Sequence, residues 1–287
     1  MATATINPNV KCACGDCKEI GKVRYVRIAP PSDGWVYGKL VSGHNSKGGD
    51  TISLCEYTKV EILETKKVNT PKGEECRTFF QVLDGNSEGV GKTLSMTEAH
   101  AKQHLLNAKR KYEKIKIGVL DLNWKEKVYS VQRHDQVLFQ CAGEIHYAGL
   151  TIPVTLTSRE DGQPQLYEPL SPGTYNLMAP DFPHPHQYSV AYRQEKRGQF
   201  DLAWFHIEDL KHPKEHRYLH MGHFSEGCVS ITHIKDWESL YHKIICYRSD
   251  GNAEAKTGGG HYIGTIEVSK NAAQVPTNSQ PHRLSSF

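Results

Sequence analysis

The feature that most constrains the fold is a succession of short segments rich in β-branched and aromatic residues, separated by turn-forming residues. Two of them, residues 23–28 and 35–41, flank Pro30-Pro-Ser-Asp-Gly34, a sequence typical of a turn. Similar segments recur to residue 268, so we predict a mainly β protein with few helices. The further predicted strands are residues 60–63, 78–83, 115–120, 127–131, 136–140, 151–156, 171–178, 202–207 and 261–268.

Two stretches have helical periodicity instead. Residues 95–114 open with Ser95 and Glu98 in the spacing of a capping box. The same stretch has an apolar face and a basic face, and we expect the basic face to be solvated, with binding to a partner or a membrane surface as the alternative. A second helix is predicted after Thr232, which is a plausible N-cap. Its apolar residues, at helical spacing, are Trp237, Leu240, Tyr241, Ile244 and Ile245.

These patterns divide the chain into five parts. The second part has the short strands of a small barrel-like module, loosely similar to Src-homology-3 barrels. The fourth part is the main domain, and the polar last part is predicted to be disordered. The predicted bounds are 1–20 (irregular, Cys-rich), 21–94 (β-rich module), 95–114 (basic helix or linker), 115–268 (main domain) and 269–287 (tail).

Composition excludes several classes of protein. The 287 residues are 38% hydrophobic and 23% charged, which is typical of a globular protein, and the net charge of +3 gives no basic footprint for nucleic acid. No run of 18 apolar residues predicts a membrane span. The first residues lack the pattern of a signal peptide. We therefore expect a cytoplasmic protein, or one exported without a cleaved signal to act in the periplasm or cell envelope.

The chain has eight cysteines, and in a long chain without a signal peptide we expect most of them to be reduced. Cys12, Cys14 and Cys17 form a tight cluster near the start. Three thiolates without a fourth ligand nearby leave two alternatives, a zinc site or an oxidation-prone segment.

The segment richest in chemical groups is Arg217-Tyr-Leu-His-Met-Gly-His-Phe-Ser-Glu-Gly-Cys-Val-Ser-Ile231. Here His220 lies eight residues before Cys228. A thiol needs a base to become a nucleophile, and an imidazole within reach can take its proton. Gly227 leaves room for a substrate carbonyl, and backbone N–H groups beside such a cysteine can bind an oxyanion. The spacing fits a strand ending near His220, a turn from Gly222 to Gly227, and Cys228 returning beside the strand.

This segment resembles the catalytic signature of the L,D-transpeptidase (YkuD-like) family. Leu219-His-Met-Gly222 matches its histidine-glycine element, and Ser225-Glu-Gly-Cys-Val229 matches its cysteine element. Ser171-Pro-Gly-Thr-Tyr175 is similar to the family's proline-glycine strand. The similarity covers residues 115–268, and it implies a family-like β-sandwich after the small barrel-like module.

The resemblance implies cysteine acyl transfer on peptidoglycan stem peptides, with neither metal nor cofactor. Cys228 attacks a carbonyl, a terminal D-amino acid leaves, and an amine or water accepts the acyl group. A secreted antibacterial toxin is one version of this function, and the N-terminal module then binds peptidoglycan, a delivery component or an immunity protein. The implied site residues are Cys228 (nucleophile), His220 (base), Ser225, and Gly227, Gly222, His223 and Tyr218 around the substrate or oxyanion.

Several alternatives stay open at this site. Ser225 either orients His220 or caps a turn, His223 is an alternative base, and His206 is interpreted as a strand histidine beside the site. Glu226 and Ser230 replace a histidine and an arginine that many family members have. They leave open a cysteine amidase or acyltransferase acting on another peptide or protein. A non-catalytic binding module with a decayed site is the third possibility.

Two competing motifs are rejected. His184-Pro-His186 and the histidines up to residue 223 lack the spacing of a zinc site. Residues 86–93 resemble a phosphate-binding loop, but Asn86 occupies the first glycine position and repeated strand–helix units are missing.

Overall fold

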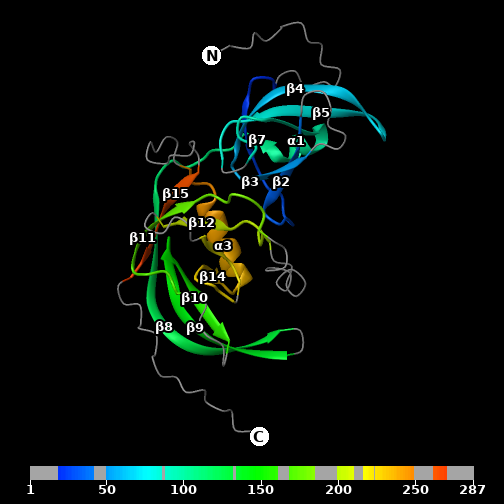
Figure 1. Ribbon diagram of the computed structural model, residues 1–287. Coiled ribbons are helices and arrows are strands. Elements are labelled where there is room, and N and C mark those ends of the chain that lie inside the picture. The colour runs from blue at the N-terminus through cyan, green and yellow to red at the C-terminus, as the bar shows by residue number, and fades with distance from the viewer. Residues whose placement is uncertain are drawn as a thin grey trace. The chain divides into compact units, whose positions relative to one another are not determined.

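The computed structural model describes residues 19–41, 50–85, 88–131, 134–160, 168–184, 199–209, 216–222, 224–248 and 261–269. The chain splits into two compact units (Figure 1). The first is Met1–Ala29 with Val36–Lys109, and the second is Pro30–Trp35 with Arg110–Phe287. Most of the described residues lie in strands, so the predicted mainly β class with few helices is confirmed.

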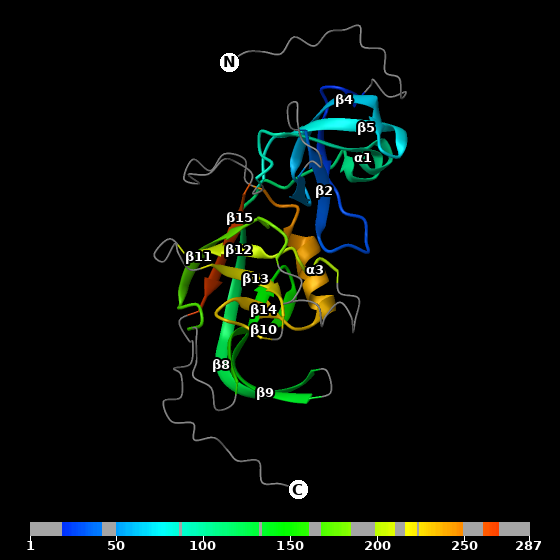
Figure 2. The same ribbon diagram turned by 45° about the vertical axis from the view of Figure 1, so that its right-hand side comes forward.

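The first unit is built on one sheet, with the strand order β3-β2-β6-β5-β4-β1-β7. The strands whose register is described pair antiparallel, and β4 and β5 form its longest hairpin (Figure 2). The described strand order ends at β3 and β7, so this unit is an open sheet and not the barrel-like module that we predicted. The strands are β1 (Val23–Val26), β2 (Trp35–Leu40), β3 (Thr51–Cys55), β4 (Lys59–Thr70), β5 (Gly73–Val82), β6 (Thr93–Thr97) and β7 (Leu105–Leu106).

One face of this sheet carries an apolar core. Val60 and Ile62 of β4 are buried and alternate with less buried neighbours, as the period of a strand requires. Phe80 and Leu94 from the neighbouring strands are fully buried beside them. Helix α1 (Glu98–His104) adds Ala101 to the same cluster.

Helix α1 is shorter than the sequence predicts. It spans seven residues, its N-cap is Thr97, whose side chain accepts from the His100 N–H, and Ser95 lies in β6. The predicted capping box is therefore wrong. The helix stops because Leu105 and Leu106 pair with β1 as β7, which gives their backbone groups sheet partners. Thr93, the last residue of the rejected phosphate-loop motif, begins the strand β6, so no helix starts there.

The second unit is a closed barrel with the order β10-β14-β13-β12-β11-β15-β8-β9. The described strands therefore close on themselves, whereas we expected a sandwich. Residues 115–120 and 127–131, predicted as separate strands, are parts of the single long strand β8, which pairs with β9 (Figure 1). The strands are β8 (Ile115–Val131), β9 (His134–Tyr147), β10 (Leu150–Glu160), β11 (Gly173–Met178), β12 (Phe205–Glu208), β13 (Arg217–Met221), β14 (Val229–Ile231) and β15 (Tyr262–Val268).

Helix α3 (Ile234–Ile244) packs against β13 and β14, the strands that carry the predicted site (Figure 2). The predicted period is confirmed, since Trp237, Leu240, Tyr241 and Ile244 are its buried residues. Its N-cap is His233 without a side-chain cap bond, so Thr232 is not the cap. No helix in the described part of the chain is both long enough and apolar enough to cross a membrane.

A short segment from early in the chain belongs to the second unit. The Phe200 N–H donates to the Ser32 carbonyl, and the Leu202 N–H donates to the Asp33 carbonyl. Gly34 has a φ of +105°, and a Cβ there would lie 2.6 Å from the Ala203 Cβ, so this turn requires glycine.

The described cysteines are not all reduced. Cys76 is disulfide-bonded, whereas Cys55, Cys141, Cys228 and Cys246 are free thiols. The predicted cluster of Cys12, Cys14 and Cys17 and the predicted tail after residue 269 lie outside the described residues.

Candidate active site

The strands β13 and β14 bring the two halves of the cysteine motif together. They pair in parallel, with Leu219 opposite Val229 and His220 opposite Ser230. Cys228 directly precedes β14, and the loop that leads to it is closed by a bond from the Gly222 N–H to the Ile231 carbonyl (3.0 Å). His220 and Ser230 lie opposite each other on the two strands, so their side chains are on the same face of the sheet. This is the face on which we place the site.

His220 is buried and both of its ring nitrogens have partners. Nδ1 lies 2.8 Å from the Met221 carbonyl oxygen, which only accepts, so Nδ1 carries the proton. Nε2 therefore accepts from the Ser230 hydroxyl, at 3.1 Å. The ring also stacks on Trp204, with 4.0 Å between centroids. Burial lowers the pKa of His220 to about 4, so the imidazole is neutral at neutral pH.

Cys228 is a partly exposed thiol beside Tyr218. Burial raises its pKa to about 11, against the opposing effects of the Tyr218 N–H, which bonds the sulfur, and of the nearby Arg217 guanidinium. The resting group is therefore a thiol and not a thiolate. Among the described residues, no hydrogen bond joins this sulfur to His220.

Ser225 holds the turn before the cysteine. Its buried hydroxyl lies 2.7 Å from the Cys228 carbonyl oxygen and 3.0 Å from that of Leu156. Its N–H donates to the Ser158 hydroxyl, and its carbonyl accepts from the Ser158 N–H. Gln140 donates to the same Ser158 hydroxyl at 2.9 Å. Of the two roles that the sequence left open for Ser225, its contacts are those of a turn cap.

Gly227 is required by the side chain packed against it. Its φ is +90°, and a Cβ there would lie 1.2 Å from Nη1 of Arg217. That guanidinium is buried and donates to the Glu226 carbonyl at 2.9 Å. The space that we expected beside Gly227 for a substrate carbonyl is thus occupied, on the Cβ side, by Arg217.

Gly222 and Tyr218 occupy different positions around the site. A Cβ on Gly222 would lie 3.1 Å from the His220 ring, and its N–H is already bonded, so it supports the ring instead of binding an oxyanion. The Tyr218 hydroxyl is bonded to Asp181, and burial raises its pKa further above the usual range. His223 lies outside the described residues.

A column of stacked rings lies behind this site, and no sequence pattern predicted it. Phe182 stacks on His184 (4.6 Å between centroids) and His184 on Trp204 (4.2 Å), which in turn stacks on His220. His184 is buried, with Nε2 3.4 Å from Oδ1 of Asp181. These residues come from segments far apart in sequence, so only the fold brings them together.

The remaining histidines form no metal centre in the described part of the chain. His206 lies on β12, its ring 5.3 Å from Tyr218, and burial lowers its pKa. No group of three or more potential metal ligands occurs among the residues that the structure describes. His186 and His212 fall outside them.

Comparisons with known proteins find no relative: no family model, no curated protein and no solved structure matches this chain.

Proposed function

We propose that the second unit is a cysteine acyltransferase of the L,D-transpeptidase type, acting on peptidoglycan stem peptides. The observation that carries the proposal is the pairing of β13 with β14, because His220 lies on β13 and Cys228 directly precedes β14, at the end of a turn that Ser225 bonds. Holding a nucleophile and a base at fixed positions is what acyl transfer requires.

In the first step, the Cys228 sulfur attacks the carbonyl carbon of the L-centred residue that precedes a terminal D-amino acid. A C–S bond forms, and the carbonyl π electrons move to the oxygen. The thiol proton passes to Nε2 of His220. The oxyanion then collapses, the C–N bond breaks, and the imidazolium returns its proton to the departing amine, which leaves a thioester.

In the second step, an acceptor attacks the thioester. A second amine gives a cross-link or an exchanged D-amino acid, and water gives the shortened peptide. The acceptor's proton passes to His220 and from there to the sulfur, so the neutral thiol and the neutral imidazole are restored.

The resting protonation states decide how the first step begins. The thiol pKa of Cys228, about 11, is higher than the imidazole pKa of His220, about 4. The thiol therefore keeps its proton at rest, and a thiolate–imidazolium pair is not stable. Proton transfer therefore has to accompany the attack. Because the Ser230 hydroxyl now donates to Nε2, it must rotate away so that this nitrogen can receive the proton.

The test is mass spectrometry of purified muropeptide tetrapeptides incubated with the protein, with and without D-methionine. We expect the wild type to release or exchange D-alanine or to form dimers, and Cys228→Ala to lose at least about a thousandfold of that rate, because the nucleophile is absent. Cys141→Ala, which removes a buried thiol of the same unit, is the matched control and should retain activity.

Two contrary results have different meanings. If the wild type leaves every muropeptide unchanged while Cys228 is still alkylated, peptidoglycan is the wrong substrate. If Cys228→Ala is as active as the wild type, the assignment of the nucleophile is wrong.

A further inference from the structure

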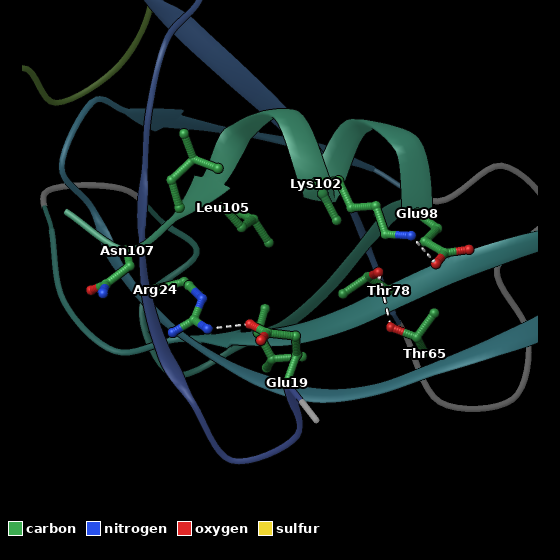
Figure 3. A pocket seen from close by; sticks show the side chains of 11 residues that line it. Glu19, Arg24, Thr65, Thr78, Glu98, Lys102, Leu105 and Asn107 are labelled. Carbon is green, nitrogen blue, oxygen red and sulfur yellow. Dashed lines mark hydrogen bonds and ion pairs between the residues drawn. The ribbon is translucent and has the colours of Figure 1, made fainter. Parts of the chain in front are cut away.

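The first unit contains a pocket that the acyl-transfer proposal does not use. It lies between helix α1 and the strands β4 and β5, and has a volume of about 300 Å³ (Figure 3). This is the lower end of the range found for small-molecule sites. Its wall combines both signs of charge, hydroxyl groups and aliphatic side chains, and the residues that matter for its chemistry are Arg24, Glu98, Lys102, Thr65, Thr78 and Ile62.

One end of the pocket is formed by an arginine and a carboxylate. The Arg24 guanidinium lines it and is paired with Glu19, as Figure 3 shows. Glu19 also accepts from Lys22 at 3.0 Å, and this bond, with the charge of Arg24, holds the pKa of the Glu19 carboxyl below its usual range. Lys22 does not line the pocket, but the Arg24 guanidinium does, and it has more N–H donors than its bonds to Glu19 and to the Val23 carbonyl use, which leaves this end suited to a second anionic group.

The other end is acidic in its deeper part. The Glu98 carboxylate is only 18% exposed, and its partner Lys102, 2.7 Å away, is 60% exposed. A surface pair of this kind is weak because water and side-chain entropy oppose it. The Glu98 Oε1 atom is buried, so a ligand ammonium that enters the pocket can compete with Lys102 for this carboxylate.

Aliphatic groups connect the two ends. Ile62, Ala101 and Leu105 are buried and line the pocket. The Thr65 and Thr78 hydroxyls are bonded to each other at 3.1 Å beneath Lys102 and Glu98 (Figure 3). The lining contains no aromatic ring, so it lacks the flat surface on which sugars and bases stack.

We propose that this pocket binds a small zwitterion with an aliphatic body, an amino acid or short peptide with free ends, whose carboxylate meets Arg24 and whose ammonium meets Glu98. The proposal rests on the first unit alone, so it stands or falls separately from the chemistry of Cys228. The pocket's size limits the ligand to a few residues, and its aliphatic wall favours side chains such as that of leucine.

The test is calorimetric titration of the full chain with the dipeptide alanyl-leucine, its N-acetylated form and its C-terminal amide. Each blocked form lacks one charge that the pocket is expected to bind. Since a hydrogen bond to a charged group contributes about 1.5–3 kcal/mol, each should bind about tenfold to a hundredfold more weakly than the free dipeptide.

Variants assign each end of the ligand to its residue. Glu98→Gln should remove the preference for a free amine, and Arg24→Gln should remove the preference for a free carboxylate. Lys67→Gln and Glu74→Gln are matched controls, because this ion pair lies on the same β4–β5 hairpin but does not line the pocket. Ala101→Met, which fills the pocket from α1, should abolish binding, and hydrogen exchange on β4 and β5 checks that each variant is folded.

The outcomes separate cleanly. Saturable binding that needs both free ends and is lost in Ala101→Met supports the site. Equal affinity for the free and blocked dipeptides would overturn the zwitterion assignment. If none of the three dipeptides binds, or if binding is unchanged in Ala101→Met, the site itself is overturned.

Discussion

The two units use buried polar groups in different ways. The buried polar groups of the first unit are bonded in separate pairs, such as Glu56 with Arg27 and Thr65 with Thr78. The second unit instead buries Gln140, Ser225 and His220, and each of them is hydrogen-bonded in or beside one turn. Burying polar groups costs free energy unless they are hydrogen-bonded. The hydrogen bonds of these three buried side chains therefore hold the cysteine turn in one conformation.

The two units can be followed separately in solution. All four tryptophans fall in the second unit: Trp124, Trp204 and Trp237, and also Trp35, which is the first residue of β2 but whose indole N–H donates to the Leu202 carbonyl of the second unit. Tryptophan fluorescence therefore reports unfolding of the second unit, and hydrogen exchange of β4 and β5 reports opening of the first.

The largest effect should come from Gly227→Ala. The new Cβ would meet the buried Arg217 guanidinium, and alanine is strained at a φ of +90°. Together, overpacking and strain should lower the free energy of unfolding of the second unit by about 4 kcal/mol, measured from urea curves by tryptophan fluorescence. Gly149→Ala is the matched control, because φ is +79° there with nothing within 4 Å, and it should cost about 1–2 kcal/mol. Equal costs for the two would mean that Arg217 moves freely and that the turn is not rigid.

The next effect is a dependence of the stability of the second unit on pH between 6.5 and 4. The folded pKa of His220, about 4, lies below its ordinary value of 6.5, so the unfolded chain binds this proton more readily between those values. Stability from this group is complete above pH 6.5 and falls by about 3 kcal/mol as pH drops towards 4.

The measurement is the urea midpoint of tryptophan fluorescence between pH 7.5 and 4. His220→Gln should reduce the wild-type slope to the part that His206 contributes, since burial lowers the pKa of His206 too, whereas His146→Gln, at an exposed histidine of the same unit, should keep the slope. A slope that is unchanged in His220→Gln would show that other groups carry the acid sensitivity.

The sequence predicted individual strands and helices better than it predicted which strands pair to close the barrel. Enrichment in β-branched and aromatic residues located the strands around residues 115–120 and 262–268, and the helical period located α3. It did not reveal that β8 runs unbroken through residue 131, because an amphipathic pattern does not report which strands pair. For the same reason, the sandwich was predicted where the strands close into a barrel.

Only the part of the candidate site that lies in one stretch of sequence was predictable. His220, Gly227 and Cys228 lie close in sequence, so their spacing alone identified them. His184 and Trp204 contact the site only through tertiary packing, and no local pattern identifies such partners. Local propensity also misled at Leu105, where pairing with β1 replaced a predicted helix.

Ser225→Ala should have a smaller effect than the change at Gly227. Removing the hydroxyl leaves the buried carbonyls of Cys228 and Leu156 without this donor, and an unsatisfied buried group costs about 1–3 kcal/mol. We expect a loss of about 2 kcal/mol in the unfolding of the second unit, and faster alkylation of Cys228 because its turn is loosened. Ser239→Ala, an exposed hydroxyl on α3, is the control and should change neither quantity. Unchanged stability in Ser225→Ala would remove the main support for a rigid turn.

The smallest effect is expected from Thr65→Val, which removes a buried hydroxyl from the first unit as Ser225→Ala does from the second. Its hydroxyl is bonded to Thr78 at 3.1 Å, and both residues are buried, as Ser225 is. However, both threonines line the pocket, so water can replace the lost partner of Thr78. Hydrogen exchange of β4 and β5 should therefore detect a loss of only about 0.5 kcal/mol, below the usual cost of an unsatisfied group. A cost equal to that of Ser225→Ala would mean that the first unit also depends on a dry polar contact, and that the contrast between the units lies only in the identity of their buried groups.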